Sequence, residues 1–308
     1  MVRKAMLSLW CVVFIAVGNI SGQDTSHFEE AKTKRLLGTP GTPTVQMQTG
    51  IAWPAIRGYG QNMNGGTAVT LQAGFSAFNK QAPRFIRYQG WYLTSGLAQP
   101  HLLFPNLAQS SNRGSGLNLH VNSFGLNHAA GFGPRIGAVG VIPYVRNGWQ
   151  WNIMDFQWSG LHAAVGRYHD LFQGKPHLGI QTASGVLIRF SDNLAIGAGG
   201  YTDLIFPQVQ TWPLVGSTLL EYGGRFGIDF VSKSLREDRP VLGSLIPFFL
   251  KTLWTGSLYY LRSSHGYWPF MIKQDASIYR EEHIVDMNFS YDAPLRILGI
   301  RMSMLIMF

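Results

Sequence analysis

The sequence predicts an all-β protein: an antiparallel transmembrane β-barrel of about 12 strands (10–14), with a short N-terminal helix. Three observations carry this prediction. The chain ends in a segment whose alternate residues are apolar, and its last residue is Phe308. Charged residues make up 13% of the chain, against about a quarter in ordinary soluble domains. Beyond the N-terminal segment, no apolar run approaches the roughly 18 residues that a membrane helix requires.

The final segment, residues 296–308, shows the alternation most clearly. One face of the expected strand carries Arg301 and Ser303. The other face is apolar throughout: Leu298, Ile300, Met302, Met304, Ile306 and Phe308. In a membrane barrel the apolar face contacts lipid and the other face lines the lumen. We therefore expect Arg301 to point inward.

The start of the chain is typical of an exported protein. Arg3 and Lys4 precede the apolar run 6–17, and the small residues Ser21 and Gly22 offer a cleavage point. This pattern predicts a cleaved signal peptide over residues 1–22. Removing Arg3 and Lys4 leaves 23 Lys+Arg against 16 Asp+Glu, so the net charge falls from +9 to +7.

The next segment, residues 23–43, predicts a short periplasmic helix followed by a Pro/Gly linker. Ser26 and Glu29 form a capping-box pattern, and Gly38 is placed to end the helix. This segment is a tail or a docking element for a protein partner. The barrel is then expected over residues 44–308.

Apolar and polar residues alternate in further segments, which we interpret as strands. Turns are predicted at Asn147-Gly148, at 191–193 and at 292–294. The apolar segment 241–254, which contains Pro247, is a candidate interfacial or plugging helix before a strand. The other segments expected to be strands are 45–53, 69–76, 86–92, 117–122, 136–144, 149–167, 186–190, 194–198, 222–230, 252–262 and 285–291. Alternation alone also fits a two-layer soluble sandwich, and the export signal, sparse charge and terminal Phe favour the barrel.

Two sets of candidate residues follow from the alternation. The polar residues expected to line the lumen, beside Gln46, Gln48, Gln72 and Ser290, are Arg87, Gln89, Asn118, His120, Asn122, Arg225, Asp229, Asp286, Asn288 and Arg301. The aromatic residues expected at the headgroup level are Trp53, Trp91, Trp149, Trp151, Trp254, Tyr259 and Tyr260. Such a lumen is either open to anionic solutes or closed by pairs such as Arg225 with Asp286 and Asp229 with Arg301.

No motif identifies a reaction. The nine histidines are scattered and the one cysteine, Cys11, lies in the signal peptide, so neither a metal site nor a cofactor is expected. His120 and Ser123 are candidates for a lipid-hydrolase site, but residues three apart on a strand point to opposite faces. His128 is the other histidine nominated for that chemistry. No phosphate-binding loop is present, and the chain lacks a basic run suited to nucleic acid.

In its signal peptide, alternating strands, aromatic content and terminal Met-Leu-Ile-Met-Phe308, the chain resembles bacterial outer-membrane β-barrel proteins, with a faint similarity to exported Bacteroidota proteins. The resemblance implies contact with outer-membrane lipid and recognition of the last strand by barrel-assembly machinery. The leading hypothesis is a pore for small polar or anionic solutes. The alternative is a non-conducting barrel that scaffolds a secretion, motility or surface assembly, and the third is an outer-membrane lipid hydrolase.

Overall fold

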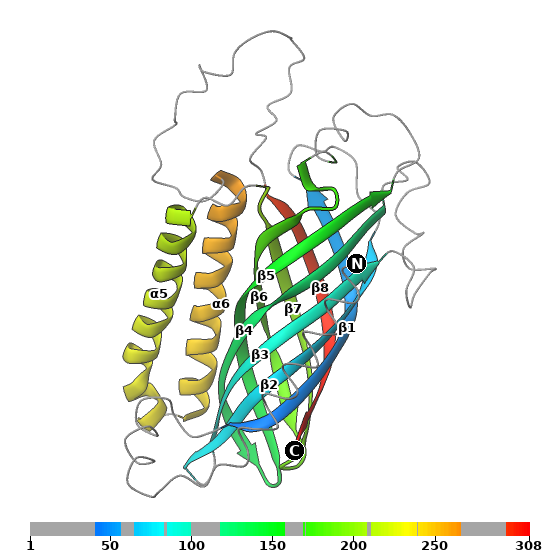
Figure 1. Ribbon diagram of the computed structural model, residues 1–308. Coiled ribbons are helices and arrows are strands. Elements are labelled where there is room, and N and C mark those ends of the chain that lie inside the picture. The colour runs from blue at the N-terminus through cyan, green and yellow to red at the C-terminus, as the bar shows by residue number, and fades with distance from the viewer. Residues whose placement is uncertain are drawn as a thin grey trace, which may run out of the picture.

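Eight antiparallel strands form a closed barrel in the computed structural model, which describes residues 41–56, 65–82, 85–99, 118–157, 169, 171–207, 211–238, 240–265 and 294–308 (Figure 1). Each strand pairs with its neighbours along the chain, and β1 closes the ring by pairing with β8. The strands are β1 (Thr42–Ile56), β2 (Gly66–Ala82), β3 (Phe85–Gln99), β4 (Asn118–Ile136), β5 (Val139–Gln157), β6 (Pro176–Arg189), β7 (Leu194–Ile205) and β8 (Leu295–Met307).

The predicted barrel is confirmed, but its expected size of about 12 strands is wrong. One error is the turn predicted at Asn147-Gly148, which lies inside the single long strand β5. There Gly148 leaves room for the side chain of Asn127 on β4, so the glycine serves packing and not a turn. Two further segments expected to be strands are helical. Another expected strand, residues 285–291, lies outside the described residues together with the turn expected at 292–294.

Connection lengths differ between the two ends of the barrel. Only residues 83–84, 137–138 and 190–193 separate successive strands at the end where Phe308 lies, which we call the turn end. Gly137 has a positive φ in its turn, and the predicted turn at 191–193 is confirmed. It lies at the turn end, because Asn193 accepts a hydrogen bond from the Met307 amide. All the long connections leave from the opposite, loop end.

Strand β8 alternates as the sequence predicts. Its odd-numbered residues are buried toward the lumen, and its even-numbered residues from Leu298 onward are exposed on the outer wall. Arg301 is 4% exposed, whereas its neighbour Met302 is 63% exposed. On the neighbouring strand β1 the even-numbered residues face inward, because Gln46 and Gln48 are buried and pair with Leu305 and Ser303. The inward face of each strand therefore continues around the ring.

Two helices, α5 (Thr211–Asp238) and α6 (Pro240–His265), are inserted between β7 and β8. They form an antiparallel hairpin that lies beside the barrel wall, along much of its height (Figure 1). The strands predicted at 222–230 and 252–262 are therefore wrong, and the helix predicted over 241–254 is confirmed as part of α6. None of the helices in the described part of the chain combines the length and apolar character of a membrane-crossing helix.

The error in α5 has a specific cause. Tyr222, Phe226 and Phe230 alternate with polar residues at period two, but they are also spaced by four. Residues four apart share one face of a helix, so the same letters fit both structures. The predicted signal peptide and the helix predicted in residues 23–43 lie outside the described residues. Strand β1 begins at Thr42, within the expected linker.

Candidate functional site

The lumen is filled by three layers of side chains. The layer at the turn end consists of apolar and tyrosine side chains: Ile86, Tyr88, Tyr92, Ala129, Ile142, Tyr144, Leu187, Ala195, Leu305 and Met307. The hydroxyls of Tyr88 and Tyr92 are 2.7 Å apart and hydrogen-bonded. A Cβ at Gly90 would clash with the Tyr92 ring, so this glycine makes the space that the ring occupies.

The middle layer is polar. Arg146 donates from Nη2 to Gln46 Oε1 at 2.7 Å, and Asn127 donates from Nδ2 to Thr94 Oγ1 at 2.6 Å. Other members are Gln48, Gln72, Gln150, Asn152, Gln181, Asp203, Arg301 and Ser303, all buried. The guanidinium of Arg301 lies 4.8 Å from the centre of the Tyr201 ring, a cation–π distance. This layer carries two arginines and one carboxylate.

The layer at the loop end is apolar and includes a residue from outside the strands. Leu119, Val121, Met154, Phe156 and Ile297 contribute from the wall. Phe172, from the connection between β5 and β6, joins them and is fully buried. Gln173 holds this connection in place by accepting a hydrogen bond from the Phe156 amide at 2.8 Å.

Two small cavities lie between these layers in the described residues. One cavity in the lumen, beside Thr70, Asn152 and Asp203, has a volume of about 30 Å³. Another, beside Ala52, Leu119 and Ile297, has a volume of about 10 Å³. A cavity needs roughly 10–15 Å³ of such volume to hold one water, so each of these two holds a few waters at most. The described part of the lumen is therefore a packed interior, as small barrels commonly are.

Five of the expected lumen residues lie on the outer wall, which corrects the prediction. On β3, Arg87 and Gln89 face outward while Tyr88 fills the lumen. The expected faces are also reversed on β4, where Leu119 and Val121 face inward and the outward residues are Asn118, His120 and Asn122. The outward residues can be polar because they lie near strand ends, where side chains reach water. The inward residues are apolar because large apolar side chains fill a narrow lumen. The apolar face was therefore mistaken for the lipid face.

The other candidates are distributed differently. Arg301, Gln46, Gln48 and Gln72 lie in the lumen. Arg225 and Asp229 are on α5, outside the barrel, so neither forms the predicted pair across the lumen. Asp229 instead pairs with Lys251 of α6 at 2.6 Å. Asp286, Asn288 and Ser290 lie outside the described residues.

The aromatic candidates also divide between barrel and helices. Trp53, Trp91, Trp149 and Trp151 are exposed on the outer wall of the barrel. Trp254, Tyr259 and Tyr260 belong to α6 and not to the barrel wall. Trp254 packs against Gly224 of α5 and holds the two helices together. Tyr259 contacts the wall residues Ile180, Leu204 and Phe206.

A row of polar residues crosses the outer wall beneath the helices. His128, Asn147, Thr182 and Thr202, on β4 to β7, are direct register partners of one another. We call these four residues the outer polar row. Thr182 and Thr202 are hydrogen-bonded through their hydroxyls at 2.6 Å. Nearby, Thr252 of α6 donates to Ser184 of β6 at 3.2 Å.

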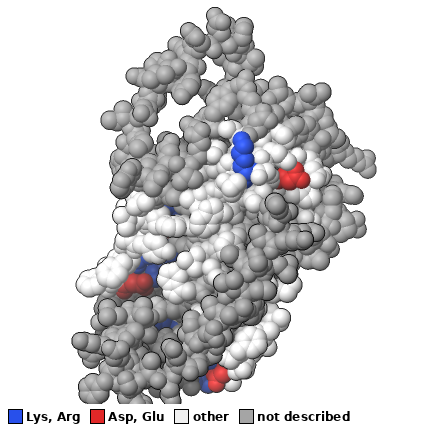
Figure 2. Space-filling model, in the orientation of Figure 1, with Lys and Arg blue, Asp and Glu red and all other residues white. Residues whose placement is uncertain are grey.

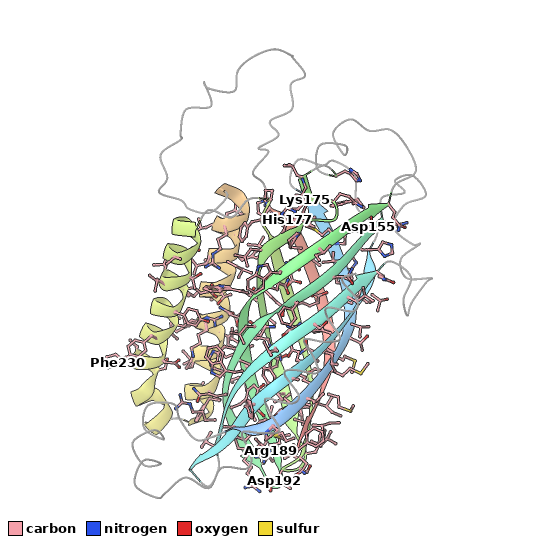
Figure 3. All side chains as sticks on the ribbon, in the orientation of Figure 1. Asp155, Lys175, His177, Arg189, Asp192 and Phe230 are labelled. Carbon is pink, nitrogen blue, oxygen red and sulfur yellow. The ribbon has the colours of Figure 1, made fainter. Side chains whose placement is uncertain are left out.

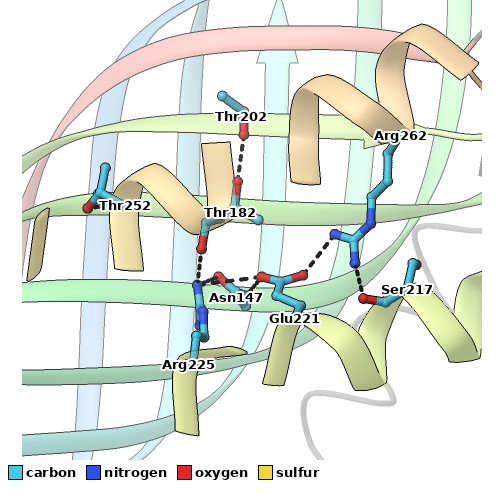
Figure 4. A network of polar contacts seen from close by, with 10 residues as sticks. Asn147, Thr182, Thr202, Ser217, Glu221, Arg225, Thr252 and Arg262 are labelled. Carbon is cyan, nitrogen blue, oxygen red and sulfur yellow. Dashed lines mark hydrogen bonds and ion pairs between the residues drawn. The ribbon is translucent and has the colours of Figure 1, made fainter. Parts of the chain in front are cut away.

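The helices meet this row through a cluster of buried charges (Figure 4). Glu221 accepts a hydrogen bond from Asn147 and pairs with Arg225 at 3.5 Å and with Arg262 at 2.8 Å. Arg225 also donates to Asn147 Oδ1 at 2.5 Å and to Thr255 Oγ1 at 2.9 Å. Glu221 and Arg262 are almost completely buried. We call Asn147, Glu221, Arg225 and Arg262 together the charged seam.

Sequence reasoning missed the outer polar row and the charged seam. Register places Asn147 beside His128 and Thr182, and register is not visible in one strand alone. One signal was present in α5, where Ser217, Glu221, Arg225 and Asp229 recur at intervals of four. That spacing forms a polar stripe on a helix.

The described residues do not assemble hydrolase chemistry around the nominated histidines. His120 faces outward, whereas Ser123 lines the lumen cavity. His128 packs its ring against Trp91, with the ring centres 4.4 Å apart. In the same part of the chain, no group of three His, Cys, Asp or Glu is arranged to hold a metal.

Comparison with known proteins gives matches in structure only. No protein-family model and no curated sequence matches the chain. One similar solved structure is Neisserial surface protein A, with 9% identity and a TM-score of 0.40, covering 86% of this chain and 97% of the other. Another is the outer membrane enzyme PagL, with 14% identity and a TM-score of 0.28, covering 52% and 84%. The barrel assignment rests on the strand pairing of this chain, and neither likeness carries an argument about function.

Proposed function

We propose that the protein is a non-conducting outer-membrane β-barrel that serves as a scaffold for a surface assembly. The outer wall supports a membrane location, because its exposed side chains between the two ends are largely apolar. Labelled charged residues lie toward the ends, with Asp155 and Lys175 at the loop end and Arg189 and Asp192 at the turn end (Figure 3). Among the described residues on the face in Figure 2, charged side chains are few. Short turns at one end and long connections at the other are the usual pattern of such barrels.

The packed lumen is the single observation that carries the non-conducting assignment. A solute that crossed the barrel would have to pass the Tyr88–Tyr92 layer, the hydrogen-bonded polar layer and Phe172. A pore for anionic solutes has the support of the mature net charge of +7 and of the buried Arg146 and Arg301. Both arginines, however, contact neighbouring side chains within the buried polar layer.

The scaffold role has its own support. Two long helices form a hairpin that is bound to the barrel wall through the charged seam. A barrel that only had to sit in the membrane would not need them. We further propose that the assembly binds the long connections at the loop end or the segment 23–43, and that barrel-assembly machinery recognises the strand ending at Phe308.

Conductance in planar lipid bilayers tests the proposal. The wild-type protein is expected to produce no channel openings. A variant with Tyr92, Arg146 and Phe172 all replaced by alanine removes one filler from each layer and is expected to conduct. This variant shows that an open lumen is detectable in the same assay. Discrete openings from the wild-type protein would overturn the non-conducting assignment in favour of the pore.

A pull-down from the native membrane in mild detergent tests the scaffold role. The protein is expected to migrate in a complex with other outer-membrane or surface proteins. Migration as a lone barrel, with no associated protein after crosslinking, would contradict the role even if the lumen is closed.

A further inference from the structure

We propose that the α5–α6 hairpin is embedded in lipid beside the barrel and contacts acyl chains with its outward face. This inference rests on the membrane location proposed above. The hairpin lies against the outer wall at the height of the strands (Figure 1). Because the hairpin covers part of the wall that would otherwise contact lipid, it displaces the lipid at that place. The side of the hairpin that points away from the barrel then contacts the surrounding lipid.

The distribution of side chains on the hairpin agrees with that position. Its buried polar residues face the barrel or the neighbouring helix, and they include Ser217, Glu221, Ser232, Ser244, Thr255 and Arg262. The large apolar residues face away. On α5, Leu219 is 69%, Phe226 75% and Phe230 74% exposed, and on α6 Leu253 is 66% exposed. A helix pair in water has the opposite distribution, with its apolar residues buried and its charges outside.

The outer polar row explains why the hairpin is needed there. Asn147, Thr182 and Thr202 are polar groups on a wall that otherwise faces lipid. Lipid offers no hydrogen bonds, so exposed polar groups at that depth are costly. The hairpin covers Asn147 with Glu221 and Arg225 and presents Thr252 to Ser184. In turn, the wall shields the charges of the hairpin from lipid, so hairpin and barrel complete one another.

Among the described side chains of the hairpin, a charged pair near the surface lies toward one end. Asp229, which is 43% exposed, forms an ion pair with Lys251 of α6. It lies in the half of α5 nearer the junction with α6, and the sequence from Lys233 to Arg239 is strongly charged. In the sequence, the apolar part of α5 is therefore followed by charged residues, which suit the level where acyl chains give way to headgroups.

Lipid is favoured over a protein partner because the outward face of the hairpin continues an apolar surface that surrounds the barrel. On β8 the same kind of surface is formed by Ile300, Met302 and Met304. Among the described residues, the exposed side chains of the hairpin are mainly of the same apolar type as those of this wall. The one occupant that meets both surfaces at the same depth is the lipid itself.

Nitroxide labelling tests the proposal in the intact chain, reconstituted in phosphatidylcholine vesicles. The lone cysteine is replaced by Cys11→Ser, and single cysteines are introduced as Phe226→Cys, Leu253→Cys, Met302→Cys and Asp192→Cys. Met302 reports the barrel wall, and Asp192, whose side chain is 88% exposed at a turn, reports water. Collisions of each label with oxygen, which dissolves in lipid, are compared with collisions with a water-soluble nickel chelate.

The labels at Phe226 and Leu253 are expected to match Met302, with an oxygen-to-nickel ratio several-fold above that at Asp192. Nickel access at Phe226 and Leu253, with Met302 protected, would overturn the inference and leave the membrane barrel standing. Protection of these two sites from both reagents would also overturn it and indicate a protein surface over the hairpin. Nickel access at Met302 would instead refute the membrane location on which the inference rests.

Discussion

The lumen and the charged seam both bury polar groups, but they stabilise them in different ways. The polar layer of the lumen consists mostly of amides and hydroxyls that bond across several strands, as Asn127 does with Thr94 and Gln181. The charged seam is organised around one carboxylate. Glu221 contacts Asn147 from the barrel, Arg225 from its own helix and Arg262 from α6.

This difference indicates where the molecule tolerates change. In the lumen, contacts such as the hydrogen bond from Arg146 to Gln46 join single pairs of side chains, so one substitution removes one such contact. In the charged seam, removing Glu221 leaves two buried arginines without their shared anion. We therefore expect single substitutions to be costly at the seam and moderate in the lumen.

Replacing Glu221 by leucine is expected to have the largest effect. Breaking a buried ion pair by removing one partner typically costs about 3–5 kcal/mol, because the remaining charge is uncompensated. Urea unfolding in detergent micelles measures the loss, and proteolysis shows whether the hairpin detaches first. Glu221→Gln, which has the same size and no charge, is the matched control. Its stability should lie between that of the wild type and that of Glu221→Leu. A Glu221→Leu protein as stable as the wild type would contradict the organising role of this carboxylate.

Replacing Arg146 by methionine is expected to have a moderate effect in the lumen. Methionine fills much of the same space, and the main loss is the hydrogen bond to Gln46 Oε1, which is left buried without this donor. Such losses amount to about 1–3 kcal/mol. The same unfolding measurement checks the value, with Arg146→Lys as the control that retains a charge. A loss equal to that of Glu221→Leu would remove the contrast between the two regions.

Replacing the whole seam by apolar residues is expected to restore most of the stability. In the variant Asn147→Leu, Glu221→Leu, Arg225→Met, Arg262→Met, no buried charge is left unpaired. Apolar replacement of complete buried ion clusters is often neutral or stabilising, so we expect a net change within about 1 kcal/mol of the wild type. Stability is compared with that of Glu221→Leu alone. A variant no more stable than the single substitution would show that the seam contributes more than charge compensation.

Replacing Asp192 by asparagine is expected to have the smallest effect. Asp192 pairs with Arg189 at 2.5 Å, but its side chain is 88% exposed at the turn end. Surface pairs of this kind contribute about 0–1 kcal/mol and weaken with salt. Unfolding at low and high ionic strength measures this contribution. A loss above that of Arg146→Met would show that exposure does not separate weak from strong polar contacts in this molecule.

The barrel could be predicted from the sequence because two faces of opposite character leave a repeating signal. The alternation of β8 and the sharp turn at 191–193 are local features, and both are confirmed. The sequence did not show which face of each strand contacts lipid. In β3 and β4 the inward face carries Tyr88, Leu119 and Val121, because a narrow lumen needs bulky fillers.

The charged seam was not predictable because it depends on three separate elements. Register aligns Asn147 with the outer polar row, and the hairpin brings Glu221 from the connection between β7 and β8. In α5, a spacing of four fits period two as well, so the helix was interpreted as a strand. The charged residues Arg225 and Asp229 were for the same reason expected in the lumen.

The position of the hairpin in the chain also has a consequence for assembly. Strand β8 pairs with β7, from which residues 206–294 separate it, and with β1 at the opposite end of the chain. Its contacts are therefore among the most distant in sequence, and closing long loops makes such pairing slow. Until β8 arrives, β1 and β7 present open edges that are competent for edge-to-edge association. A chain that ends before Leu295 would retain both helices but would leave those two edges unpaired.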